Sequence, residues 1–162
     1  MTQTIKRKDE ILGRLNNNPN GFLYRFSRCD DIALVNDLLK LCFGDRSEYG
    51  ALDHLDDRYL LVFSKGKLIA MTGIDSAQNS PFTGDEIDWT CCDPEYRRLG
   101  IITGALSALL QLNTSKTVFC SCYRQPGKEK ANLHNIMIRL GFQCELYGYK
   151  AFDQRYFKAC SV

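Results

Sequence analysis

The sequence predicts an α/β fold, in which a central mixed sheet of about six to seven strands carries helices on both faces. Two observations support this prediction. From about residue 22 to residue 157, apolar runs of strand length alternate with segments whose apolar residues recur at helical spacing. The order is one strand, one or two helices, three strands, a helix, a strand, a helix and one or two strands. A strand–helix–strand crossover makes part of such a sheet parallel.

The length and charge of the chain bound its class. We expect a single domain over residues 1–162, with residues 1–20 as a peripheral N-terminal helix. The 21 basic and 19 acidic residues are too balanced to indicate nucleic acid as a partner. No apolar run approaches the roughly 20 residues needed to span a bilayer, and residues 1–6 lack the apolar centre of a signal peptide. We therefore expect a cytoplasmic protein with no membrane partner.

The chain has eight cysteines. Neither Cys91-Cys92 nor Cys120-Ser121-Cys122 has the C-x₂₋₄-C spacing that is typical of zinc sites. A disulfide framework is not expected without a signal peptide. We expect free thiols that pack as small hydrophobic side chains, and no metal site.

Caps and breakers delimit the first elements. Apolar residues among charges predict a short amphipathic helix over residues 5–16, which an Asn-rich segment ends. Strand formers over residues 22–26 predict the first strand. Asp30 or Asp31 then caps a helix with one apolar face, which ends at Gly44.

The middle of the chain combines an acidic segment with a hairpin. Residues 45–57 are mostly acidic, and a short helix is expected over residues 47–55. His54 could act there as a base or a ligand, but a lone exposed histidine beside carboxylates is more often a solvated surface residue. Apolar runs over residues 59–63 and 67–74 flank a Ser-Lys-Gly turn, which indicates a β-hairpin.

The second half alternates strands and helices. A run bounded by glycine and proline predicts a strand over residues 85–92, and helical periodicity predicts a helix over residues 100–112. Residues 117–123 form the next expected strand. A helix follows from residue 128 or 129 to 140, ended by glycine, and one or two strands lie within residues 144–157.

The turn between residues 92 and 101 has the properties of an anion site. Pro94 ends the preceding strand, and Gly100 stands where the next helix begins. The first amide groups of a helix have no partner within it, and the positive end of its dipole adds to the charges of Arg97 and Arg98. Such a turn binds phosphate.

These residues resemble the acetyl-CoA signature of the GNAT superfamily of acyl-CoA N-acyltransferases. That signature is Arg or Gln, two residues, Gly, one residue, then Gly or Ala. Residues 97–101 fit it, whereas Ile102 departs from it, and Gly104 could supply the small residue in a shifted turn. The segments 93–96 and 140–142, Asp-Pro-Glu-Tyr and Leu-Gly-Phe, are also common in the family.

The family fold has the same element order, so the resemblance covers nearly the whole chain and implies a GNAT-like fold. It implies acetyl-CoA as cosubstrate, with the turn holding the pyrophosphate. The family's usual Asn at the start of the last helix is displaced here, and Asn132 and Asn135 are the nearest candidates. The expected cofactor-binding residues are Cys91, Cys92, Arg97, Arg98, Leu99, Gly100, Ile101, Thr103 and Asn132.

Acetyl transfer from a thioester to an amine needs a neutral amine, and two carboxylates could provide it. Glu86 and Asp88 lie two apart on an expected strand, so their side chains face the same side. Burial raises the pKa of a carboxylate toward a value useful for accepting the ammonium proton. In the family branch that acetylates protein lysines, the base lies eleven residues before the signature, as Glu86 lies before Arg97. Asp88 could instead bind the cationic amine.

The transfer also needs a polarised carbonyl and a proton for the departing thiolate. The resemblance implies that a backbone N–H within residues 90–92 polarises the carbonyl. Family members often use a tyrosine as proton donor at the position of Met137, so Tyr123, Tyr147, Tyr149 and water stay open for this role. Direct attack within a ternary complex is a simpler route than a nucleophilic Cys91 or Cys92.

The resemblance implies a primary amine of a small molecule or a protein as acceptor. The acidic residues of segment 45–57 and of the strand before the turn favour a cationic amine over one that bears a carboxylate. A homodimer stays open. The alternative function is a catalytically weak or inactive CoA-binding module on the same fold. Met137 and Ile102 support this alternative because both depart from the family pattern.

Overall fold

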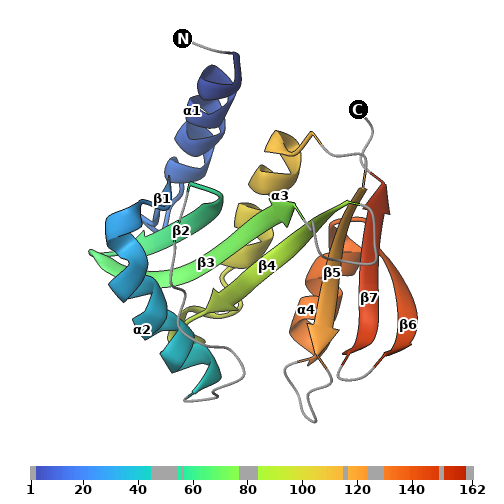
Figure 1. Ribbon diagram of the computed structural model, residues 1–162. Helices are drawn as coiled ribbons and strands as arrows, with labels where there is room; N and C mark the ends of the chain where they lie inside the picture. Colours follow the sequence, from blue (N-terminus) through green and yellow to red (C-terminus); the bar gives the residue numbers. More distant parts are fainter. Residues whose placement is uncertain are drawn as a thin grey trace. The chain divides into compact units, whose positions relative to one another are not determined.

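The computed structural model describes residues 3–44, 55, 57–76, 84–114, 117–123, 130–149 and 152–159 (Figure 1). Of the short helix expected over residues 47–55, only Leu55 is described, and His54 lies outside the described residues. The elements are α1 (Gln3–Asn16), β1 (Leu23–Phe26), η1 (Cys29–Asp31), α2 (Ile32–Phe43), β2 (Tyr59–Ser64), β3 (Lys67–Ser76), β4 (Asp85–Cys92), η3 (Pro94–Tyr96), α3 (Ile101–Leu112), β5 (Thr117–Tyr123), α4 (Lys130–Arg139), β6 (Gln143–Tyr149) and β7 (Phe152–Ala159).

The described strands confirm the predicted mixed sheet. Seven strands pair in the order β1-β2-β3-β4-β5-β7-β6. β4 and β5 run parallel, whereas the pairs β1–β2, β2–β3, β5–β7 and β6–β7 are antiparallel. The sequence left one or two strands open at the C-terminal end, and the structure has two. In the described part of the chain, no helix combines the length and the apolar character needed to cross a membrane.

The chain divides into two compact units. The first consists of Met1–Gly73 and Trp89–Leu112, and the second of Ile74–Asp88 and Asn113–Val162. β4 therefore contributes its first half to the second unit and its second half to the first unit.

The first unit buries both faces of its strand β2. Leu61 and Phe63 belong to one buried cluster with Leu38 of α2. Leu60 and Val62 alternate with them and are fully buried as well, and α3 contacts β2. Helices α2 and α3 thus cover opposite faces of this part of the sheet, as predicted (Figure 1). A strand buried on both faces has no polar side, which is why this run is apolar throughout.

Helix α1 packs on β1 and α3 within the first unit. Ile11 is buried, and Arg14 Nη2 donates to Gln111 Oε1 at 3.0 Å. Leu15 lies 3.8 Å from the position that a Cβ would take at Gly104 of α3. The helix expected at the periphery therefore covers part of the core.

In the second unit, β4 and β5 approach each other closely. Asp85 and Glu86 form the parallel register with β5. Gly84 precedes them with a φ of +142°, and a Cβ there would lie 2.6 Å from the carbonyl oxygen of Thr117. This position therefore requires glycine, both for its backbone conformation and for space. α4 packs on β6, and Met137 of α4 is fully buried.

Candidate functional site

The connection from β4 through η3 to α3 is the candidate phosphate site, and residues 97–103 are called the phosphate turn below. Arg98 and Gly100 have φ values of 70° and 77°, so both adopt the left-handed conformation. The first helical hydrogen bond runs from Gly104 N–H to Gly100 O at 2.9 Å. The amides of residues 101–103 precede that bond, at the positive end of the α3 dipole.

Arg97 is the half-buried arginine of the phosphate turn, whereas Arg98 is exposed. Arg97 Nε donates to the carbonyl oxygen of Cys92 at 3.2 Å, which holds the guanidinium at the end of β4. Leu99 is 52% exposed, and the Ile101 side chain is buried in the core. Ile101 can therefore contribute to a ligand only through its backbone.

The structure shows the surroundings of Ile102 and Gly104, the two residues that bear on the small position of the signature. Ile102 and Thr103 are half-buried, and Ile101 rather than Ile102 takes the core position. Gly104 faces Leu15 of α1, which lies at the ordinary contact distance of 3.8 Å from the position of a Cβ at Gly104.

Asp93, which the sequence analysis did not single out, fixes the start of this connection. Its side chain is buried, with Oδ1 accepting the Glu95 N–H at 3.0 Å and Oδ2 accepting Lys67 Nζ at 2.7 Å. Its own N–H donates to Ile69 O at 2.8 Å. Burial by itself would raise the pKa of Asp93, but the hydrogen bonds from Lys67 and Glu95 hold that pKa below its ordinary value. An Asp before Pro94 is a helix N-cap signal, whereas nothing in the sequence points to Lys67.

Trp89 gives β4 an irregular backbone shortly before the turn. Its φ of 44° lies in the left-handed region, which is rare for a bulky side chain. Trp89 is partly buried and packs against the core cluster beneath α2. Backbone strain of this kind concentrates at functional sites, where the surrounding packing maintains it.

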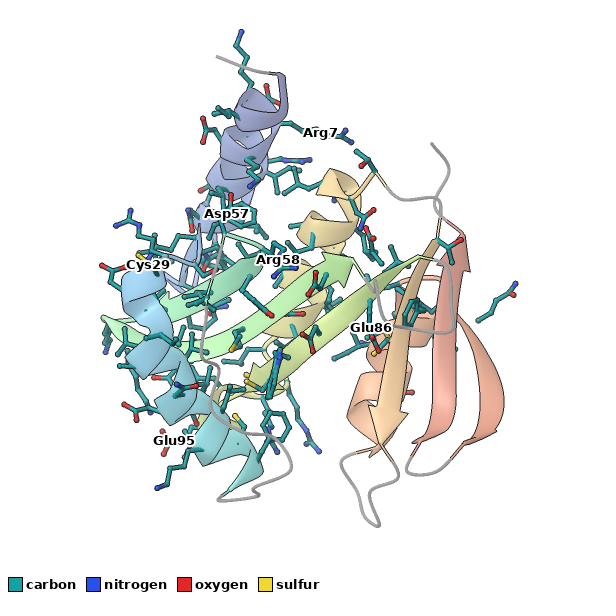
Figure 2. The ribbon with its side chains drawn as sticks, viewed as in Figure 1. Arg7, Cys29, Asp57, Arg58, Glu86 and Glu95 are labelled. Carbon is teal, nitrogen blue, oxygen red and sulfur yellow. The ribbon has the colours of Figure 1, made fainter. Side chains whose placement is uncertain are left out.

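Glu86 and Asp88, the two candidate carboxylates, lie in the part of β4 that belongs to the second unit. Figure 2 labels Glu86 on this strand. Both are half-buried, and the alternation of a strand predicts that their side chains face the same side. Glu86 stands opposite Phe119 in the parallel register with β5. Asp85 alternates with them and accepts a hydrogen bond from Asn113 Nδ2 at 2.9 Å.

The other candidates of the second unit lie on two different elements. Tyr123 is the last residue of β5, and Asn132 belongs to α4. Asn135 of the same helix is exposed. Met137, at the position where the resemblance implies a tyrosine, is fully buried and fills the core.

The adjacent thiols of β4 have different surroundings. Cys91 belongs to the buried cluster beneath α2, and Cys92 is half-buried. Burial raises the pKa of Cys92 to about 11, and a hydrogen bond to Cys42, together with burial, raises the pKa of Cys91 well above its usual value. Both thiols are therefore protonated near neutral pH, which disfavours either as a nucleophile.

Cys42 of α2 is a further residue that the sequence analysis did not single out. It hydrogen-bonds Cys91, and its sulfur accepts the backbone N–H of Cys92. That amide is one of the donors expected for the thioester carbonyl, and in this structure it has a partner. No group of three or more His, Cys, Asp or Glu side chains in the described part of the chain is arranged to hold a metal ion.

No protein-family model matches the sequence, and no curated protein matches it. The fold, however, is similar to those of solved acetyltransferases. A GNAT-family acetyltransferase from Bacillus cereus ATCC 10987 matches 87% of this chain and 99% of its own, with a TM-score of 0.64 and 15% identity. The ribosomal-protein-S18-alanine N-acetyltransferase from Escherichia coli matches 87% and 95%, with a TM-score of 0.64 and 15% identity.

A putative acetyltransferase from Salmonella typhimurium, solved with its cofactor acetyl-CoA, matches 87% of this chain and 95% of its own. Its TM-score is 0.61 and its identity 11%. At such identities the likeness shows a shared fold, and the residues of the site have to be judged by their own chemistry.

Proposed function

We propose that this chain, which has the fold of the GNAT acetyltransferases, is an acetyl-CoA-dependent N-acetyltransferase that acts on a primary amine. The observation that carries the proposal is the phosphate turn. Arg97 and Arg98 stand at the N-terminus of α3, on a connection that the buried Asp93 holds in place. Two positive charges and a set of helix N-terminal amides suit a pyrophosphate.

The cofactor is proposed to bind through its pyrophosphate at this turn. Arg97 and Arg98 provide charge, and the amides that precede Gly104 provide donors. The buried side chain of Ile101 restricts that residue to a backbone contact. The proposed cofactor-binding set is Cys91, Cys92, Arg97, Arg98, Leu99, Gly100, Ile101, Thr103 and Asn132.

Glu86 is proposed as the general base. Bound acetyl-CoA supplies the thioester, whose carbonyl carbon gains a bond to the amine nitrogen and loses its bond to sulfur. Glu86 takes the proton of the ammonium group. The attacking nitrogen loses its second proton as the amide forms. Tyr123, Tyr147, Tyr149 or water gives a proton to the departing sulfur and takes up the proton that the nitrogen releases. The protonated thiols of β4 favour direct transfer in a ternary complex.

The proposed acceptor class is a cationic primary amine. Asp88, half-buried on the same side of β4 as Glu86, could hold the ammonium group while Glu86 takes its proton. The Escherichia coli structural neighbour is named as an N-acetyltransferase of a protein alanine, which also has an amine acceptor. The acceptor amine could belong to a small molecule or to a protein. We further propose that the chain forms a single domain and acts in the cytoplasm, as a monomer or a homodimer.

A CoA-binding module without turnover is the second candidate. Three observations favour it, namely the half-buried Ile102 at the small-residue position, the buried Met137 at the tyrosine position, and the Cys92 amide that is paired with Cys42. Such a module would bind CoA and give no acetylated product.

Glu86→Gln tests the proposed base. Glutamine keeps the shape and hydrogen bonding of glutamate but takes no proton, so we expect kcat to fall by about 100-fold or more while CoA binding persists. Amines such as L-lysine, a diamine and a lysine peptide are incubated with acetyl-CoA, and products are read by mass spectrometry. This readout avoids thiol reagents, which would react with the protein's cysteines.

Glu10→Gln, on the exposed face of α1, is the matched control and should leave kcat unchanged. Near-normal turnover of Glu86→Gln across a pH series would remove Glu86 as base and direct attention to Asp88. CoA binding by calorimetry with no product from any amine would favour the module without turnover.

A further inference from the structure

Three cysteines meet where the end of α2 contacts the last residues of β4. Cys42 packs against the buried cluster that contains Cys91. The Cys91 thiol hydrogen-bonds the Cys42 sulfur, which also accepts the N–H of Cys92. The carbonyl of Cys92 in turn accepts Arg97 Nε at 3.2 Å. The thiol pair is therefore connected, through one residue of β4, to the arginine of the phosphate turn.

The two thiols of the pair differ in access and in ionisation. Cys91 is 6% exposed, whereas Cys42 is only half-buried. The hydrogen bond from Cys91 lowers the pKa of Cys42, and the nearby Arg97 lowers it further, against the effect of burial. The opposite effects on Cys91 keep that thiol protonated. Cys42 is thus the thiol that reaches reagents in solution and the one that ionises first.

We propose that Cys42 and Cys91 are a redox-active pair, which a low-molecular-weight disulfide converts to an intramolecular disulfide, and that this conversion weakens CoA binding at the phosphate turn. The effect on CoA rests on the proposed function, whereas the disulfide does not.

The reaction consists of two thiol–disulfide exchanges. The Cys42 thiolate attacks one sulfur of the disulfide RSSR, which forms a Cys42–SR bond and releases RS⁻. Cys91 then attacks the Cys42 sulfur and releases the second RS⁻. The protons of the two protein thiols pass to the two RS⁻ groups, so that the protein is oxidised by two electrons and RSSR becomes two RSH. The contact between Cys42 and Cys91 makes the second step fast, because it is intramolecular.

Oxidation would act on the turn through Cys92. Disulfide formation brings the Cys42 sulfur from hydrogen-bond distance to covalent distance of Cys91, which shifts it relative to the Cys92 N–H that it now accepts. Movement of Cys92 then displaces the carbonyl that anchors Arg97. We expect the oxidised protein to bind CoA at least tenfold more weakly, with recovery on reduction.

Peptide mapping after exposure to oxidised glutathione tests the disulfide without any need for CoA. Trypsin places Cys42 in the peptide of residues 41–46, and Cys91 with Cys92 in the peptide of residues 68–97. We expect these two peptides to be linked, both in the wild type and in Cys92→Ser, which assigns the link to Cys91. A link that is lost in Cys92→Ser, or no link at oxidant concentrations that modify the exposed Cys29, would overturn the proposal.

Calorimetry with CoA tests the consequence. We expect oxidised wild type and oxidised Cys29→Ser to lose affinity at least tenfold, and Cys42→Ser to be insensitive to oxidised glutathione. If the mapped disulfide leaves the CoA affinity unchanged, the proposed control of the turn is wrong. If the reduced protein does not bind CoA at all, the proposed function fails, and the mapping still decides whether the pair is redox-active.

Discussion

Arg97 is the arginine of the phosphate turn whose side chain the structure holds in place. It is half-buried, and the bond from its Nε to the Cys92 carbonyl fixes the guanidinium while Arg98 extends into solvent. A fixed guanidinium loses less side-chain entropy on binding a phosphate than an exposed one does. We therefore expect Arg97 to contribute more to CoA affinity than Arg98, although the two are adjacent.

Arg97→Ala should weaken CoA binding by about 10- to 100-fold, the range expected for the loss of a charge-assisted hydrogen bond, and Arg98→Ala should weaken it less. Binding of pantetheine, which lacks the phosphates, should hardly change in either variant. Titration of both ligands into each variant measures this, with Arg7→Ala on α1 as the control (Figure 2). Equal losses for CoA and pantetheine would mean that the turn is structural and that the pyrophosphate lies elsewhere.

At the scale of single elements, β1 shows how a short terminal strand of the sheet is protected. β1 pairs with β2 on one side and ends the strand order on the other. On that outer side, Asn16 Oδ1 accepts the Tyr24 N–H at 2.6 Å, and Asn16 Nδ2 donates to the Tyr24 carbonyl at 3.1 Å. Asn18 makes the same pair of bonds to Phe22, at 3.0 and 2.8 Å. Two side-chain amides thus replace a neighbouring strand.

Asn16→Ala should lower the free energy of unfolding by about 1 to 3 kcal/mol, because it leaves a partly buried donor and acceptor of Tyr24 without partners. Urea denaturation measures the change, and light scattering reports whether the uncovered edge promotes association. Asn17→Ala, at the exposed neighbouring position, should be within about 0.5 kcal/mol of wild type. A neutral Asn16→Ala would mean that water replaces the amide at no cost.

The whole molecule should lose stability in acid, because two buried carboxylates are held ionised. Asp31 accepts two bonds of 2.6 Å from Arg25 and one of 2.8 Å from the Arg28 N–H. The bond from Arg25 is the main reason that the pKa of Asp31 lies below its ordinary value. The lowered pKa of Asp93 has the same consequence. A carboxylate with a lowered folded-state pKa stabilises the protein above its unfolded pKa, and this contribution is lost as the pH falls through the folded value.

Asp31→Asn should lower the free energy of unfolding by about 2 to 3 kcal/mol at pH 7, somewhat less than for a fully buried pair because Arg25 remains 27% exposed. Its stability should also fall less steeply than that of wild type between about pH 5 and pH 2. Thermal melts over this range measure both effects, with the exposed Asp30→Asn as control. Parallel pH profiles of Asp31→Asn and wild type would contradict this origin of the acid sensitivity.

The sequence by itself determined the type and order of the described α-helices and strands, and it located the turn between β4 and α3 for which phosphate binding is proposed. Strand 85–92 and strand 117–123 have the predicted bounds, and α2 ends before Gly44 as predicted. These features depend on interactions within a few residues, such as caps, breakers and the alternation of apolar side chains. The position of Arg97 and Arg98 before a helix N-terminus could be predicted for the same reason, because α3 begins only a few residues after them.

Only the tertiary structure decided what holds the turn and what surrounds it. Lys67 reaches Asp93 across 26 residues of sequence, and Cys42 reaches Cys91 from another element. The sequence also could not predict that Ile101 rather than Ile102 is buried, because helical periodicity allows either side chain to face the core. Such contacts depend on how each helix packs on the strands and on how it is rotated about its axis. Both are set by the close packing of side chains from many elements in the core, and not by a local run of residues.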